Sequence, residues 1–225
     1  LTVQQGWAWS GGGGGIYAGQ SLALSNVTVI SNAAVGEYYL DFTSGGGGVY
    51  VDGDLNLTAT TFMTNIAWMG GGAIVLGDVN AISSTIAYNM AYLAAGIFAS
   101  DTTRIDNSIF QANQAILGGG LFVGGLWIDE SEFGKHLVSV ISGTQFIANG
   151  GLIFGTADAL NNQGGGLVAL RPVLVTNSAF LSNTAMIGAA GFAVNVFTMT
   201  GSLVADNIAQ VGAGWLGQLG DALSH

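Results

Sequence analysis

Residues 62–74 read FMTNIAWMGGGAI, and this stretch contains the two units that recur along the chain. The first unit is an apolar residue followed three positions later by Asn and then by a small residue, as in Phe62, Asn65 and Ala67. The second is a run of small residues that ends in a large apolar one, here Gly71 to Ile74. Self-similarity at a fixed period is typical of repeat architectures, so these units are the starting point for the fold.

Both units keep one phase along the chain. The small-residue unit ends at Ile16, Val49, Ile74, Ile97, Leu121, Leu167, Phe192 and Trp215. The intervals between these residues are 33, 25, 23, 24, 46, 25 and 23, so the period is near 24. The other unit places Asn32, Asn65, Asn89, Asn113, Asn149, Asn183 and Asn207 between them. We interpret the irregular stretches as insertions at about 33–45, 122–136 and 150–162, although the 46-residue interval is also long enough for a degenerate extra rung.

A period of 24 residues is compatible with a leucine-rich repeat or with a β-solenoid. Helical repeats are usually longer, and helices tolerate neither triple glycines nor β-branched runs. Apolar residues alternate with period 2 at Leu22 and Leu24 and again at Val173 and Val175, which is typical of strands. The sequence therefore predicts an all-β fold, a parallel β-helix of seven to eight rungs with three short strands each. Residues 1–225 are predicted to form one domain of this kind.

The recurring residues have predicted roles in such a fold. The seven Asn residues would stack as a ladder, because an Asn amide can bond both backbone and the next amide. Asn also tolerates the left-handed conformation that corners need, as Gly does. The apolar ends of the small-residue units would stack inside the coil. A hydroxylic column is predicted to face inward as well, at Thr60, Ser84, Ser108, Thr144, Ser178 and Ser202.

The residue after each small-residue unit would point outward if strand parity holds. Together these residues predict an exposed apolar stripe, which usually marks an interface. If the parity were reversed, the stripe would lie inside. The predicted lateral interface consists of Tyr17, Tyr50, Val75, Phe98, Phe122, Val168 and Leu216.

Four of the Asn units read FxxN, and residues 71–74 read GGAI. This combination resembles the polymorphic outer membrane protein repeat, which occurs in autotransporter-like surface proteins and in other extracellular right-handed β-helices. The resemblance covers almost the whole chain. It implies a right-handed parallel β-helix at an extracellular or cell-surface location, and it implies no particular activity. The FxxN units begin at Phe62, Phe110, Phe146 and Phe180.

Composition excludes several classes of protein. The chain has three basic residues and a formal net charge of −10, which argues against a nucleic-acid partner. It has no Cys, and so no disulfide scaffold or thiolate site. It contains 38 Gly but one Pro and no strict triplet, unlike collagen. No apolar run reaches the roughly 18 residues of a transmembrane helix.

No residue pattern predicts catalysis or a cofactor, so we expect a non-enzymatic protein. Asp52 and Asp54 have the spacing of a carboxylate pair, but solvated turn acids explain them more simply. The charged stretch from Asp129 to His136 is interpreted as a solvated insertion, with a weak Ca²⁺ site at Asp129–Glu132 as the alternative. Asn26 and Asn56 begin N-glycosylation sequons.

Terminal repeats normally carry polar caps, and the sequence shows none at either end of the array. The leading hypothesis is therefore an extracellular structural protein that stacks head to tail on itself into a fibril. The alternative is an adhesin stalk whose insertions bind a host or glycan partner, with Tyr38, Tyr39 and Trp127 stacking on sugars. A polysaccharide-active enzyme and an ice-binding protein are less favoured; the Thr and Ser pairs that would bind ice fail at Ile82 and Asp106.

Overall fold

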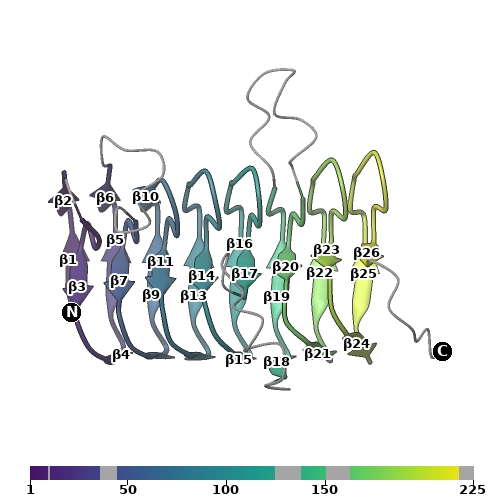
Figure 1. The fold of residues 1–225 in the computed structure, drawn as a ribbon, viewed down its shortest axis with the longest axis horizontal. Helices are drawn as coiled ribbons and strands as arrows, with labels where there is room; N and C mark the ends of the chain where they lie inside the picture. The colour runs from purple at the N-terminus through teal and green to yellow at the C-terminus, as the bar shows by residue number, and fades with distance from the viewer. Residues whose placement is uncertain (10, 36–44, 125–137, 151–162, 218–225) are drawn as a thin grey trace.

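A computed structural model describes residues 1–9, 11–35, 45–124, 138–150 and 163–217. These residues form a parallel β-helix, as the repeat predicts, and all their regular elements are strands. In Figure 1 the rungs lie side by side along the long axis in chain order, from the purple rungs at the N-terminus to the yellow ones at the C-terminus. Each strand hydrogen-bonds to its counterpart in the next rung, so residues far apart in sequence become neighbours.

Each complete rung contributes one strand to each of three long sheets. The first sheet contains β1 (Thr2–Gln4), β5 (Thr28–Ile30), β9 (Thr61–Met63), β13 (Thr85–Ala87), β16 (Ile109–Gln111), β19 (Gln145–Ile147), β22 (Ala179–Leu181) and β25 (Leu203–Ala205). The second contains β3 (Ile16–Ala18), β7 (Val49–Val51), β11 (Ala73–Val75), β14 (Ile97–Ala99), β17 (Leu121–Val123), β20 (Leu167–Ala169), β23 (Gly191–Ala193) and β26 (Trp215–Gly217). The third contains β4 (Leu22–Ser25), β8 (Leu55–Thr58), β12 (Val79–Ile82), β15 (Thr103–Asp106), β18 (Ser139–Ser142), β21 (Val173–Thr176) and β24 (Phe197–Thr200).

A fourth, short sheet follows the Asn residues. It contains β2 (Trp7–Ala8), β6 (Ala33–Ala34) and β10 (Ile66–Ala67). Isolated bridges continue the same line through Met90, Gln114, Gly150, Thr184 and Ile208. This corner of the rung therefore presents one row of equivalent positions along the molecule.

The register confirms the period of 24 but corrects which residues are equivalent in two rungs. Ala73, not Ile74, lies opposite Val49, and Gly191, not Phe192, lies opposite Leu167. The rung length is then 24 residues from Val49 through Ala73 to Ile97. The prediction failed because it took the large residue as the marker, whereas these two rungs place a small residue on the inner face. At Gly191 the space is filled by the indole ring of Trp215.

The long intervals contain no further rung. β3 pairs directly with β7, and β17 pairs directly with β20. Most of the predicted insertions lie outside the described residues. Their predicted limits are a few residues too wide, because Ala33 and Ala34 belong to β6 and Leu121–Val123 is β17.

The core is one continuous column of apolar side chains inside the coil. In the first sheet its central row contains three phenylalanines that stack on one another. The ring centroids of Phe110 and Phe146 are 5.0 Å apart, and those of Phe146 and Phe180 are 4.6 Å apart. The interplanar angles are 13° and 4°, so the rings are nearly parallel. The row consists of Val29, Phe62, Ile86, Phe110, Phe146 and Phe180, all fully buried.

The bends of each rung regularly contain residues with positive φ, among them one just before the ladder position and one just after the third-sheet strand, as at Tyr88 and Ser83. The ladder Asn residues do not adopt this conformation, contrary to the prediction; the residue immediately before each of them does. This position is occupied by side chains of every kind, so composition alone does not reveal it. Its members are Ser31, Thr64, Tyr88, Ala112, Ala148, Ser182 and Asp206, and Gln5 has the same conformation before Gly6 in the first rung.

Candidate functional site

The predicted Asn ladder is present and runs through seven rungs. From Asn65 onward, the side-chain oxygen of each ladder Asn accepts two hydrogen bonds from the preceding rung, one from the backbone N–H and one from the side-chain amide of the preceding Asn. Asn89 illustrates this, with its N and Nδ2 at 3.1 and 3.0 Å from Oδ1 of Asn113. The other amide hydrogen reaches a buried backbone carbonyl; Asn113 Nδ2 lies 2.8 Å from the carbonyl oxygen of Ile86. The ladder consists of Asn32, Asn65, Asn89, Asn113, Asn149, Asn183 and Asn207.

The ladder ends differently on its two sides. At the N-terminal side Gly6 occupies the ladder position, and its N–H donates to Asn32 Oδ1 at 2.9 Å. At the C-terminal side the Asn207 amide turns back and donates to the carbonyl of Ala205 at 3.0 Å. Each end is thus satisfied by groups of the terminal rung itself.

The hydroxylic column forms a second ladder, whereas the sequence predicted only that these residues face inward. In each case a backbone N–H donates to the hydroxyl oxygen of the next rung, for example Ser84 N to Ser108 Oγ at 3.1 Å. The same hydroxyl donates to the carbonyl two residues before it, as Ser108 does to Asp106 at 3.0 Å. Both ladders satisfy buried polar groups, so their role is structural. The column consists of Thr60, Ser84, Ser108, Thr144, Ser178 and Ser202.

Carboxylates at an exposed corner also accept hydrogen bonds from the backbone N–H groups of the next rung. Asp54 Oδ1 accepts from the N–H of Asp78 at 3.0 Å, and Asp78 Oδ1 accepts from the N–H of Thr102 at 3.0 Å. Asp52 instead accepts from the hydroxyl of Tyr17 at 2.7 Å. Asp52 and Asp54 therefore have different structural partners, which agrees with the interpretation as turn acids.

Tyr17 is expected to ionise above the usual range for a phenol. It donates a hydrogen bond to the Asp52 carboxylate, and this bond together with the negative charge raises the pKa of Tyr17 from 10.0. The neutral phenol is the favoured folded form, so its contribution to stability is complete below the unfolded pKa and disappears as pH rises through the folded pKa. Tyrosinate absorbance, with Tyr17→Phe to identify the signal, measures the shift. In Asp52→Asn the pKa of Tyr17 should return toward its ordinary value; an unchanged pKa would contradict this.

The predicted lateral interface is not an exposed stripe. Tyr17 is exposed, but Tyr50, Phe98, Phe122 and Val168 are at most 6% exposed. They do point away from the main core, and they form a second cluster with Met69, Leu93 and Ala94 from the preceding corner. The predicted outward direction of these side chains is therefore correct. Their predicted exposure is wrong, because the residues of the preceding corner cover them.

The other two members of the predicted stripe are Val75 and Leu216. Val75 belongs to the main core, since the shifted register of β11 places Ile74 in the outer row instead. Leu216 belongs to β26 and lies opposite Phe192 of the neighbouring strand β23.

An exposed row at the short-sheet corner was not anticipated. Trp7, Ile66 and Met90 occupy equivalent positions in their rungs and are all exposed, with Trp7 at 63%. The rung between Trp7 and Ile66 has Ala33 at this position. The sequence signal was available, because the position after each ladder Asn carries Ala33, Ile66 and Met90 in successive rungs.

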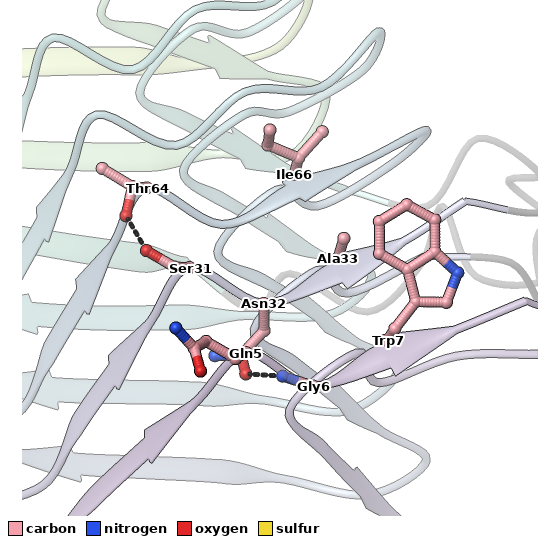
Figure 2. A pocket seen from close by; sticks show the side chains of 8 residues that line it. All are labelled: Gln5, Gly6, Trp7, Ser31, Asn32, Ala33, Thr64 and Ile66. Carbon is pink, nitrogen blue, oxygen red and sulfur yellow. Dashed lines mark hydrogen bonds between the residues drawn. The ribbon is translucent and has the colours of Figure 1, made fainter.

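A pocket of about 460 Å³ opens where Ala33 interrupts this row. Figure 2 shows the Trp7 ring on one side, Ile66 on the other, and Ala33 between them. The hydroxyls of Ser31 and Thr64, each of which directly precedes a ladder Asn, are 2.9 Å apart. The complete lining is Gln5, Gly6, Trp7, Ser31, Asn32, Ala33, Thr64 and Ile66.

The remaining predicted site residues are the two sequon Asn residues and the charged and aromatic residues of the insertions. Asn26 and Asn56 of the two sequons are exposed, which leaves their glycosylation a prediction. Asp129–Glu132, His136 and the aromatic residues Tyr38, Tyr39 and Trp127 lie outside the described residues. Within the described ranges no group of three or more His, Asp or Glu side chains is placed to hold a metal ion. The same part of the chain has no helix long and apolar enough to cross a membrane.

The described residues thus assemble two internal polar ladders, a covered apolar cluster and a surface pocket beside Trp7. Comparison of the chain with protein-family models, with curated proteins and with solved structures found no significant match.

Proposed function

We propose that this protein is a non-enzymatic structural β-solenoid of a surface or secreted fibril, in which copies stack head to tail. The observation that carries the proposal is the character of the two terminal rungs. Among the described residues, strands β1, β3 and β4 pair on one side only, and so do β24, β25 and β26 at the opposite end. Unpaired parallel strands are templates for another chain.

The side chains of the terminal rungs support this role. Leu1 and Trp9 are exposed in the first rung, and Leu203 and Val211 are exposed in the last. Apolar residues at both ends would be buried by stacking, and a heterologous contact of this kind extends without closing. The resemblance to the polymorphic outer membrane protein repeat supports an extracellular or cell-surface location.

The junction between copies would depend on backbone hydrogen bonds more than on the Asn ladder. Asn207 already donates to Ala205, and Gly6 has no side chain to accept from it. A fibril of this kind would therefore dissociate at the junctions before the rungs themselves open.

Electron microscopy and sedimentation of the purified protein test the proposal. With eight rungs at roughly 4.8 Å each, filaments should have an axial repeat of about 38 Å. Leu203→Lys places a charge on the β25 edge and should abolish the filaments, because edge lysines prevent strand addition. Leu76→Lys, at an exposed position in the middle of the array, is the matched control and should leave them intact.

Monomers at every protein concentration would overturn the head-to-tail role. They would favour the second candidate, an adhesin stalk. That candidate draws its support from the pocket beside Trp7, which is an exposed aromatic site of the kind that recognition surfaces use.

A further inference from the structure

We propose that the pocket between Trp7 and Ile66 binds a neutral saccharide ring. The inference rests on the shape and chemistry of the pocket and does not require the proposed fibril. The pocket lies on the outer side of the short-sheet corner, and its walls come from three successive rungs.

The shape follows from one small residue in a row of large ones. Adjacent strands are about 4.8 Å apart, so Trp7 and Ile66 are separated by two such steps. Ala33 in the intervening rung leaves the space between them open, and the cavity is about 460 Å³. Further along the row Ile66 is followed directly by Met90, so that step has no comparable gap between large side chains.

The chemistry is that of a ring with one apolar face and a hydroxyl rim. Trp7 is 63% exposed and offers a broad apolar surface at low entropic cost. The hydrogen-bonding groups of the pocket are the Gln5 amide and the hydroxyls of Ser31 and Thr64, which Figure 2 shows on the side away from the Trp7 ring. Asn32 forms the floor of the pocket. Its side chain is buried and its amide is hydrogen-bonded within the ladder, so it is not available to a ligand.

The charge of the lining selects a neutral ligand. None of the eight lining residues is ionisable, and the chain carries a net charge of −10. An anionic sugar would find no cation in the pocket and would be repelled by the whole molecule. The Ser31 and Thr64 hydroxyls already share one hydrogen bond, and their remaining hydrogen-bonding capacity could be used by a sugar hydroxyl but not by a purely apolar ligand. A neutral pyranose could place its apolar face on the Trp7 ring and its hydroxyls against the polar rim.

The test measures binding of cellohexaose, xylohexaose, mannohexaose and chitohexaose to the intact chain, with a galacturonic acid hexamer as the charged comparison. The readouts are calorimetry and the indole N–H resonance of Trp7, assigned with Trp7→Phe. We expect at least one neutral oligomer to bind with an affinity of roughly millimolar or better and to shift the Trp7 signal. Trp7→Ala should weaken this binding about tenfold or more.

Two further variants separate the pocket from general effects. Trp9→Ala removes an equally exposed indole two residues away that does not line the pocket, and it should bind as the parent does. Ala33→Met fills the gap with the residue that Met90 provides in a later rung, so it should fold normally and lose binding. The proposal is overturned if no neutral oligomer binds, if the charged hexamer binds better, or if Trp9→Ala is as damaging as Trp7→Ala.

Discussion

Replacing Asn113 by Ala is expected to lower the free energy of unfolding by about 3–5 kcal/mol, since each unsatisfied buried polar group costs roughly 1–3 kcal/mol. Asn113 is fully buried, and its side chain takes part in four hydrogen bonds. Its loss removes the acceptor of the Asn89 N–H and of the Asn89 amide. It also removes the donor to the Ile86 carbonyl. These groups cannot reach water, so the cost is not recovered.

Urea unfolding and hydrogen exchange at the Asn89 amide measure this effect. Exchange matters because long repeat arrays can unfold in parts, and the Asn89 N–H reports directly on the damaged rung. Asn56→Ala is the matched control: Asn56 is exposed in β8, and its one amide contact, from Asn80, is 3.4 Å long. It should cost no more than about 0.5 kcal/mol. Equal losses in the two variants would show that the ladder contributes little.

Phe146→Ala should destabilise the array by a comparable amount, about 3–5 kcal/mol, the usual cost of deleting a buried phenyl ring. Phe146 is fully buried and stacks between Phe110 and Phe180 in consecutive rungs. The neighbouring rings are held by the β16 and β22 backbones, so they cannot close the cavity without breaking register. The same unfolding measurement records the loss.

Ile147→Ala provides the comparison, because Ile147 is the next residue of β19 but lies on the outer side and is partly exposed. Its replacement should cost about 1 kcal/mol or less. A Phe146→Ala variant no less stable than Ile147→Ala would mean that the interior repacks freely, contrary to the stacked column described above.

The sequence predicted the β-helix, the Asn ladder and the inward position of the hydroxylic column because these features repeat at a fixed spacing. Asn and hydroxyl residues must recur in phase if they are to bond from rung to rung, so their positions report the structure directly. Large apolar residues are a poorer marker. Ala73 and Gly191 occupy inner positions where a large residue was expected, since bulk from another residue, Trp215 in the second case, can fill the space.

Surface features were harder to predict, because they depend on contacts between elements. The burial of Tyr50, Phe98 and Phe122 comes from Met69 and Leu93 in the corner that precedes the strands, and strand parity contains no information about that cover. The pocket beside Trp7 depends in turn on comparing three rungs at one position, which requires the register.

The asymmetry of the Asn ladder has a mechanical consequence. Along the axis the rungs are connected in series, so a stretching force is transmitted equally through every boundary, and the weakest boundary yields first. At the first boundary the ladder supplies two bonds, from Gly6 to Asn32 and from Asn32 to the Val3 carbonyl. An interior boundary such as that between Asn89 and Asn113 has three, two between the Asn residues and one to a backbone carbonyl. The molecule should therefore unspool under tension from its N-terminal rung, while the rungs around the stacked phenylalanines yield last.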